Sequence, residues 1–303
     1  MRLEFHQKLI LFAAVLAIGA AVKFDYKGAG IEESTQQPTA QPPTRLVTHE
    51  VAAEKLLDAS PTQAPPKLAT RKQSFIEFVL PTIELENHSV SQMREELSRL
   101  QQKPLLSAEE QAWLRSLGRQ YRIKSSLSEK AMIGELLTRV DRLPASLVLA
   151  QAAVESAWGT SRFAQDGNNL FGQWCMTAGC GIVPSGRSET ASHEVRRFDS
   201  VQDSVHGYFM NINTNRAYKP LRDLRSCQRG QGELLNGAIL AAGLLDYSAI
   251  GEAYVETVRT VIRVNRLESL DRVSQGLALG HFSDSGCLEE ATGLDSSPVA
   301  TGA

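Results

Sequence analysis

LPASLVLAQAAVESAWGTS, residues 143–161, is the segment around which the rest of this chain can be interpreted. Pro144 lies near its start, where the fixed φ of proline suits the first turn of a helix and the missing N–H costs little. The apolar residues that follow predict a helix to about Trp158. Gly159 and the Asp-Gly-Asn-Asn cluster at residues 166–169 mark the end of this helix and a following loop.

Glu155 is the only ionisable side chain between Leu143 and Thr160, and alanine, valine and leucine surround it in the sequence. We expect its carboxyl group to be partly desolvated, which raises the pKa and keeps the group protonated near neutral pH. Glycoside hydrolysis needs such an acid to protonate the leaving oxygen. The alternative is a solvent-facing Glu155 near the helix end, or an ion pair with Arg162.

Further elements follow the Glu155 helix. Residues 179–184 and 192–198 carry the β-branched and aromatic residues of two short strands around Ser185-Gly186-Arg187, which predicts a hairpin. Helices are then predicted at Ser200–Asn213, at about Gln231–Ala242, and from Tyr247 or Glu252 to Asn265.

A helical preface, residues 71–140, comes before the segment that carries Glu155. Three helices are predicted here, with apolar stripes that we assign to the core: a first that contains Phe75 and Leu100, a second to Tyr121, and a third at about Glu129–Asp141. Pro81 should kink or divide the first helix. Ser107 followed by Glu110 is a capping box that opens the second helix.

The two ends of the chain differ in composition from the predicted helical part. Arg2 and Lys8 precede an uncharged apolar run, Leu9–Val22, which is typical of a signal peptide or of a short uncleaved membrane anchor. We therefore expect the protein in the periplasm or on the outer face of the cytoplasmic membrane. The predicted organisation is a signal or anchor (1–27), a Pro/Thr/Gln-rich disordered linker (28–70), the helical preface (71–140), the catalytic domain (141–271) and a disordered tail (283–303).

Charge and cysteine content restrict the partners and cofactors. A net charge of −2 and a pI near 6.3 provide no basic field of the kind that nucleic-acid binding usually needs. The four cysteines suit an exported chain in which disulfides persist, and Cys175 and Cys180 are the expected pair. A zinc site with His193 as third ligand is the alternative, but the spacing is not a Cys-x-x-Cys pair. We expect no metal and no cofactor.

Two motifs carry a resemblance to a known family. Ala152–Ser161, followed by Asn168-Asn169-Leu170-Phe171-Gly172, resembles the signature of the N-acetylglucosaminidases of glycoside hydrolase family 73. The likeness extends over residues 144–265. It implies a mainly α (α+β) fold, a lysozyme-like helical domain with a small β-hairpin lobe across a cleft and with Glu155 as the acid at a helix end.

The same resemblance implies a second carboxylate on the hairpin in those members that use one. Glu189 and Glu194 are the candidates, and Glu189 is preferred because it should lie near the hairpin tip, whereas Glu194 lies inside a predicted strand. This hairpin is shorter than in relatives, so the alignment slips here. Inverting, retaining and substrate-assisted mechanisms all remain open, and the last needs only Glu155.

Aromatic residues supply the rest of a glycan-binding cleft, because sugar faces stack on flat rings. Tyr247 resembles the active-site tyrosine of the family's Gly-Tyr-Ala segment, with a spacing that differs by about one residue. Phe171, Trp174 and Tyr218, together with Glu194, are further candidates for substrate binding. Trp158 is assigned to the core.

The activity implied by the resemblance is that of an exported endo-β-N-acetylglucosaminidase. Its substrate would be the glycan strands of peptidoglycan, which it would cut at the GlcNAc-β-1,4-MurNAc bond. A lytic transglycosylase shares the Glu-Ser motif and the lysozyme-like fold, and is the alternative enzyme. A peptidoglycan-binding envelope scaffold without turnover is the alternative from another class.

Overall fold

The structure is a computed structural model, and it describes residues 68–185, 187, 192–274 and 287. The predicted signal or anchor, residues 1–27, lies outside these residues, as do nearly all of the predicted linker and of the predicted tail. In the part of the chain that is described, no helix is both long and apolar enough to cross a membrane.

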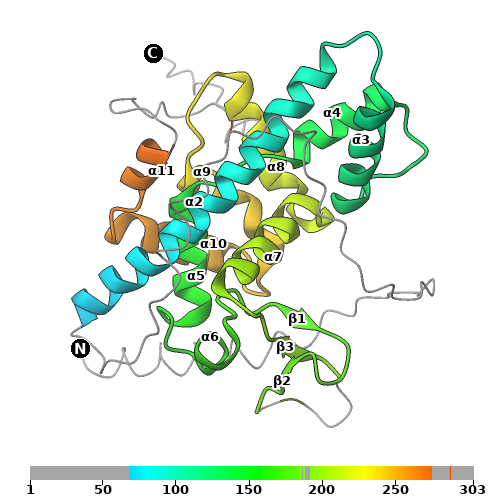
Figure 1. Cartoon of the computed structure of the whole chain (residues 1–303). Helices are drawn as coiled ribbons and strands as arrows, with labels where there is room; N and C mark the ends of the chain where they lie inside the picture. Colours follow the sequence, from blue (N-terminus) through cyan, green and yellow to red (C-terminus); the bar gives the residue numbers. More distant parts are fainter. Residues whose placement is uncertain (1–67, 186, 188–191, 275–286, 288–303) are drawn as a thin grey trace, which may run out of the picture.

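Helices form most of the structure, and α5 lies at their centre (Figure 1). Every residue of α5 from Ala145 to Ala153 is buried, and α5 packs against α2, α9, α10 and α11. A helix that is apolar on all sides is stable only when other helices surround it. The helices are α2 (Leu68–Gln101), α3 (Ala108–Gln120), α4 (Glu129–Arg139), α5 (Ala145–Ser156), α6 (Arg162–Gly167), α7 (Val201–Thr214), α8 (Lys219–Gly230), α9 (Gly237–Leu240), α10 (Glu252–Val264) and α11 (Glu268–Ser274), with the 3-10 helices η1 (Arg216–Tyr218) and η2 (Ala241–Tyr247).

The helical preface is α2, α3 and α4. α2 is one continuous helix through Pro81, so of the two expected effects of this proline, a kink or a division, the division is wrong. Pro81 lies on the exposed side of α2, while Val79 and Ile83 on either side of it are fully buried in the core. Packing of these neighbours offsets the hydrogen bond that the proline cannot donate.

Two predictions made from local sequence patterns in the preface, a capping box and an apolar stripe, are confirmed. Ser107 accepts a hydrogen bond from the backbone N–H of Glu110, and the Glu110 carboxylate accepts one from the N–H of Ser107, which completes the predicted capping box. Leu114 and Leu117 are fully buried, as the helical spacing predicted. Buried residues from Phe75 to Leu267 form one hydrophobic cluster, so the preface and the following helices share a core.

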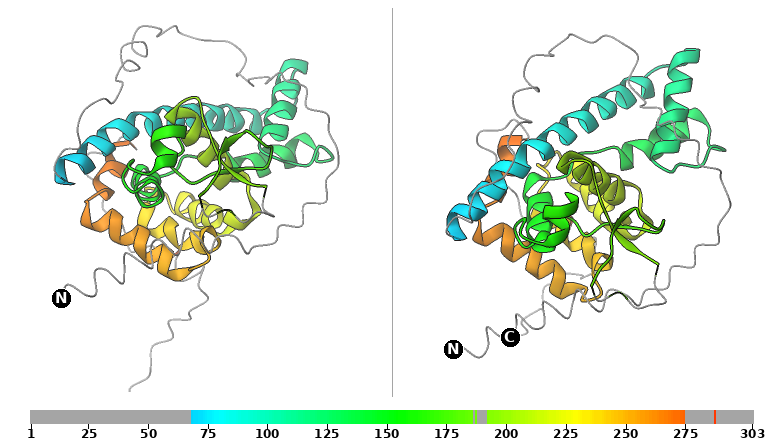
Figure 2. Two further views of the ribbon diagram at one scale, coloured as in Figure 1. Left: turned by 90° about the horizontal axis from the view of Figure 1, so that it is seen from below. Right: turned by 60° about the horizontal axis from the view of Figure 1, so that its bottom comes forward.

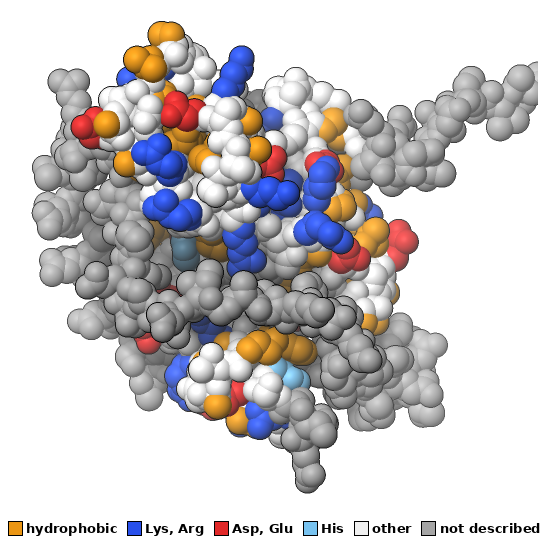
Figure 3. All heavy atoms as spheres, turned by 90° about the vertical axis from the view of Figure 1, so that its right-hand side faces the viewer, with side chains coloured by type: hydrophobic (Ala, Val, Ile, Leu, Met, Phe, Trp, Pro, Cys, Tyr) orange, Lys and Arg blue, Asp and Glu red, His pale blue; other side chains and the backbone are white. Residues whose placement is uncertain are grey.

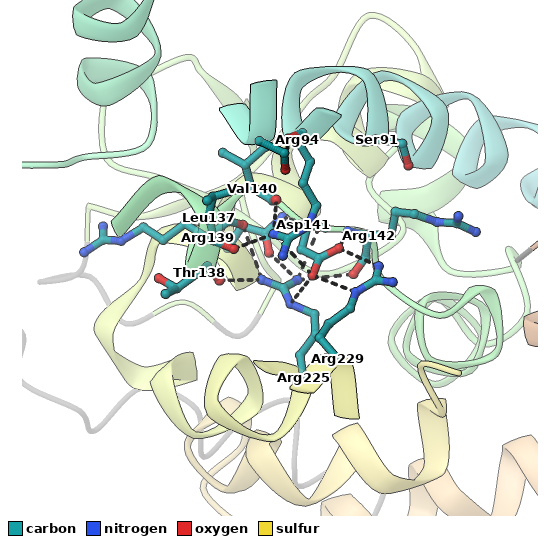
Figure 4. A network of polar contacts seen from close by, with 12 residues as sticks. Ser91, Arg94, Leu137, Thr138, Arg139, Val140, Asp141, Arg142, Arg225 and Arg229 are labelled. Atoms are coloured by element: carbon teal, nitrogen blue, oxygen red, sulfur yellow. Dashed lines mark hydrogen bonds and ion pairs between the residues drawn. The ribbon is translucent and has the colours of Figure 1, made fainter. Parts of the chain in front are cut away.

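A polar network joins the preface to the rest of the molecule around Asp141 (Figure 4). The Asp141 carboxylate lies 2.8 Å from Arg229 and 3.8 Å from Arg225 on α8, and 3.5 Å from Arg94 on α2. Arg225 is buried and donates to Asn213 on α7 and to the backbone carbonyls of Thr138, Arg139, Asp141 and Arg142. Burial lowers the pKa of Arg225 to about 10, which still leaves it charged at neutral pH.

A small antiparallel sheet forms a lobe beside the helices (Figures 1 and 2). Its strands are β1 (Trp174–Cys175), β2 (Gly181–Ile182) and β3 (Glu194–Arg196), in the order β1-β3-β2. The pairing of β2 with β3, Ile182 opposite Val195, confirms the predicted hairpin. β1 was not predicted, because a strand of two residues is too short to show an alternating pattern. Together with the helices, the lobe confirms the predicted fold class.

Two disulfides are present in the described residues. Cys175 and Cys180 are bonded, with Cα atoms 6.2 Å apart, which confirms the predicted pair. Cys227 on α8 is bonded to Cys287, a pairing that the sequence analysis did not predict. Cys287 is the one described position in the segment that we expected to be a disordered tail.

The helices after the sheet differ in part from the prediction. α7 and α10 are confirmed, whereas the helix expected at about Gln231–Ala242 begins only at Gly237. The Asn236 side chain accepts hydrogen bonds from the N–H groups of Ala238 and Ile239 and so caps the helix at this later point. α8 and α11 were not predicted.

Candidate active site

Glu155 lies in the last turn of α5 and is partly buried. Burial raises the pKa of Glu155 to about 7, although a hydrogen bond from the Tyr254 hydroxyl lowers it. Among the described residues Glu155 makes no ion pair, and Arg162 donates instead to the backbone carbonyl of Val183. A carboxyl group with this pKa is half protonated near neutral pH, as a general acid needs to be.

The chain turns sharply after Glu155 in three residues with left-handed backbone angles: Ala157 (φ 52°), Trp158 (φ 60°) and Gly159 (φ 75°). The Ser156 hydroxyl accepts a hydrogen bond from the Gly159 N–H, at 2.8 Å, inside this turn. Gly159 suits its position because left-handed angles strain residues that carry a Cβ atom. The turn therefore ends α5 directly after the Glu155-Ser156 pair.

Helix α2 packs against the outside of this turn. The rings of Phe75 and Trp158 meet edge to face, with centroids 5.7 Å apart. The ammonium group of Lys72 lies 4.7 Å from the centroid of the Trp158 ring. Trp158 thus packs on the core, as expected, and α2 holds the end of α5 in place.

Tyr254 is the hydrogen-bond partner of Glu155. Its hydroxyl donates to Glu155 Oε1 at 2.8 Å, and it accepts from Gln151 Nε2 at 3.0 Å. Gln151 Oε1 in turn accepts from the Tyr208 hydroxyl. Helices α5, α7 and α10 therefore contribute to one chain of hydrogen bonds that ends on the carboxyl group.

The loop after α6 brings backbone close to Glu155. The side-chain amide of Asn169 donates to the carbonyls of Gln173 and Arg196, both at 2.8 Å, and its Oδ1 accepts from the Gln173 N–H. These bonds fix the Asn-Leu-Phe-Gly turn against β3. Gly172 has φ +64°, and a Cβ atom added there would lie 3.9 Å from Glu155 Oε2. The second motif of the sequence thus lies beside the carboxyl group of the first.

Tyrosine rings cover one side of the site. Tyr247 is partly buried, stacks on Tyr254 with ring centroids 5.1 Å apart, and donates to the carbonyl of Phe171 at 3.3 Å. Tyr218 packs against Tyr247 at 5.8 Å and is buried. Phe171 is buried too and stacks on Tyr208. The structure therefore brings Glu155, Tyr247, Phe171 and Tyr218 together, the last two within the packed wall of the site.

Trp174 lies on the β lobe and is 46% exposed. Its ring stacks on His193, with centroids 4.3 Å apart. Figure 3 shows hydrophobic and histidine side chains side by side on this lobe, at the bottom of the view. The exposed Trp174 ring, supported by the half-buried His193, offers a flat surface of the kind that a sugar can cover.

Of the two candidates for the second carboxylate, Glu194 lies in the described part of the chain and Glu189 does not. The Glu194 carboxylate is buried and accepts from the N–H groups of Gly179, at 3.0 Å, and Gly181, at 2.8 Å. These bonds lower the pKa of Glu194 and tie the disulfide loop to β3. Glu189 lies outside the described residues.

The zinc alternative for the lobe does not fit the residues present. Sulfur atoms of Cys175 and Cys180 and a carboxylate oxygen of Glu194 lie within 4.8 Å of one another. Zinc binding requires thiolates, whereas these two sulfur atoms are joined in a disulfide.

Gln151, Tyr208 and Tyr254 are site residues to which no role was assigned from the sequence. Gln151 lies four positions before Glu155, which places the two side chains on one face of α5. This spacing of four residues is the sequence pattern from which a contact between Gln151 and the site could have been predicted. Tyr208 and Tyr254 reach the site from other helices, and their partners lie 57 and 99 positions away in the sequence.

Comparison with known families agrees with this geometry. Residues 133–267 match the glucosaminidase family, described as mannosyl-glycoprotein endo-beta-N-acetylglucosaminidase. The chain belongs to this family and is a glycoside hydrolase.

A similar curated protein is "Protein bax" of Escherichia coli (strain K12). The two are 35% identical over 190 residues, which is 62% of this chain and 68% of the relative. No solved structure matches this chain at a significant level.

Proposed function

We propose that this protein is an exported peptidoglycan hydrolase, an endo-β-N-acetylglucosaminidase that cleaves the GlcNAc-β-1,4-MurNAc bond with Glu155 as general acid. The observation that carries the proposal is the partly buried carboxyl group of Glu155, whose pKa is raised to about 7. Glu155 has a hydroxyl group and no cation as its hydrogen-bond partner in the described structure, so its proton remains available at neutral pH. Membership of the glucosaminidase family supports the reaction class.

Export to the periplasm, or to the outer face of the cytoplasmic membrane, is part of this proposal. Two disulfides support it, because disulfides persist in oxidising compartments outside the cytoplasm. The apolar run near the start of the sequence supports it independently, as a signal or as a membrane anchor.

In the proposed reaction, Glu155 donates its proton to the glycosidic oxygen as the bond to the anomeric carbon breaks. The developing positive charge on the sugar is then relieved in one of two ways. Either Glu189 acts as the second carboxylate, or the substrate's own acetamido oxygen attacks the anomeric carbon. In each case a water molecule supplies the OH group that finally binds the anomeric carbon, and its other proton goes to a carboxylate of the site. Glu194 is less suited to act as a base, because two backbone N–H groups already bind its carboxylate.

The aromatic residues have proposed roles that follow their exposure. Tyr247 is proposed to contact the sugar next to the cleaved bond, and Trp174 a sugar further along the strand. Tyr218 and Phe171 are buried and are proposed to hold Tyr247 in position.

The test is cell-wall hydrolysis by the purified protein and its Glu155→Gln variant. Clearing of a cell-wall suspension should slow by roughly 100-fold or more, because glutamine cannot donate the proton. Glu95→Gln, an exposed glutamate on α2, is the matched control and should clear at the wild-type rate. Equal clearing by the wild type and Glu155→Gln would refute the acid role.

Product analysis by mass spectrometry identifies the bond and the reaction. New reducing GlcNAc ends are expected. Anhydro-MurNAc ends would show a lytic transglycosylase instead. A wild-type protein that binds the glycan and releases no product would be a scaffold. A Glu189→Gln variant of wild-type activity would favour the substrate-assisted route.

A further inference from the structure

We propose that Tyr208, Gln151 and Tyr254 are positioning residues that act as one relay and keep the catalytic proton of Glu155 on Oε2, the carboxyl oxygen nearest Gly172. This inference rests on the proposed role of Glu155 as the acid. It adds a specific location for the proton and two residues that do not touch Glu155.

The direction of the relay follows from the number of hydrogens available. A tyrosine hydroxyl carries one proton, and an amide side chain has separate donor and acceptor ends. Tyr208 gives its proton to Gln151 Oε1, so Gln151 presents its N–H to Tyr254. Tyr254 then has its own proton directed at Glu155 Oε1.

Burial makes this direction stable. The exposed fractions are 0% for Gln151, 1% for Tyr208 and 4% for Tyr254. Reversing the amide of Gln151 would leave its N–H facing the Tyr208 proton and remove the donor from Tyr254. In a site that excludes water, unmatched polar groups are costly, so the amide keeps one orientation.

The two carboxyl oxygens of Glu155 are therefore not equivalent. Oε1 accepts the Tyr254 proton, so the exchangeable proton of the acid belongs on Oε2. Oε2 faces Gly172, where the absence of a side chain leaves room for the glycosidic oxygen of a substrate. The relay thus orients the proton before the substrate binds.

The titratable groups that face Glu155 are four tyrosines from four elements. They are Tyr208 of α7, Tyr218 of η1, Tyr247 of η2 and Tyr254 of α10, and the pKa of each is raised mainly by burial. All four are thus neutral hydroxyl groups at neutral pH. Among the described residues, no charged side chain contributes to the raised pKa of Glu155.

The test is the pH profile of kcat/KM for Tyr254→Phe, Tyr208→Phe and the double variant. Tyr254→Phe removes a hydrogen bond that favours the carboxylate, so the alkaline limb should move up by roughly one pH unit. Tyr208→Phe frees the Gln151 amide to turn and accept the Tyr254 proton, and so should move the limb in the same direction. The double variant should match Tyr254→Phe alone, because both changes break one chain.

Tyr121→Phe is the matched control, because Tyr121 is a buried tyrosine of the preface outside the relay. It should leave the pH profile unchanged. A purely structural role of Tyr208 would lower the melting temperature and leave the limb in place. A Tyr208→Phe profile equal to that of the wild type would therefore overturn the relay.

Proton NMR of the wild-type protein tests the same point if a variant does not fold. The hydroxyl proton of Tyr208 should lie near the Gln151 side chain and that of Tyr254 near Glu155. A Tyr254 hydroxyl proton that lies near the Gln151 side chain instead of near Glu155 would overturn the relay. Loss of clearing in Glu155→Gln tests the acid role separately, so either idea can fail alone.

Discussion

Burial and one hydroxyl group together set the pKa of Glu155. A general acid must hold its proton at the working pH and still release it to a weakly basic oxygen. Burial at the end of α5 supplies the first property, and the Tyr254 hydrogen bond moderates it by stabilising the carboxylate. The balance between the two places the pKa of Glu155 near neutrality.

The pH profile of the wild-type enzyme follows from this balance. Because the reaction needs protonated Glu155, kcat/KM should be retained below pH 7 and fall as the pH rises through about 7. The measurement is release of reducing ends from soluble glycan strands across a series of buffers at constant ionic strength. A fall centred near the ordinary glutamate pKa, about 4.3, would show that Glu155 is solvated when the enzyme acts.

The residues of the site differ in how far the sequence predicted them. Glu155 was identifiable because it is the only charge in a long apolar run, and Gln151 shares its helical face. The roles of Tyr208 and Tyr254 depend on hydrogen bonds that reach α5 residues from α7 and α10, which no local pattern encodes. For Glu194, no local pattern indicates that the N–H groups of Gly179 and Gly181 bind its carboxylate, because they lie 15 and 13 positions away in the sequence.

At the scale of elements, α2 holds both ends of the segment that carries the site. Its first half packs on the turn after Glu155 through Phe75, and Arg94 in its second half reaches Asp141 just before α5. The single helix α2 joins these two points. Its continuity through Pro81 therefore matters for the position of the acid.

Asp141 should be far more important for stability than its single charge suggests. Asp141→Ala leaves Arg225 buried without its counterion, so the free energy of unfolding should fall by about 3–5 kcal/mol. Asp223→Ala is the control, because Asp223 pairs with Lys219 on the surface of α8 and should change stability by less than about 1 kcal/mol. Urea denaturation followed by circular dichroism measures both, and equal effects would contradict the buried-network interpretation.

Elements with local signals were predictable and elements stabilised by distant contacts were not. The capping box at Ser107 and the apolar stripes of α3 and α4 lie within a few residues of each other. α8 was missed because its buried face mixes leucine with Arg222 and Arg225, whose burial depends on carbonyls and on Asp141 elsewhere. The end of the Glu155 helix was expected near Trp158 but lies at Ser156, where the left-handed turn begins.

At the scale of the whole molecule, the described helices form one body that is larger than the family match. The match begins at residue 133, whereas the shared core begins with Phe75 of α2. The Cys227–Cys287 disulfide also fixes a position beyond the end of the match.

The two disulfides should contribute unequally to stability. The chain-entropy relation gives about 4 kcal/mol for the Cys227–Cys287 bond, with a separation of 60 residues, and about 2 kcal/mol for Cys175–Cys180, with a separation of 5. Replacing both cysteines of one pair by serine and measuring chemical denaturation tests this order. A larger loss for the short loop would show that its bond acts mainly by shaping the folded lobe.

Because one core runs from α2 to α10, we expect a constraint on how this protein evolved. If a recombination event joined residues 133–267 to an unrelated upstream sequence, the faces of α5 and α7 that α2 covers would be left bare. The protein encoded by such a gene should be less stable, because apolar side chains of the core would be exposed to water. We therefore expect the preface to have descended together with the catalytic part, and changes at Val79 and Ile83 to be matched by changes on α5 or α7 in related lineages.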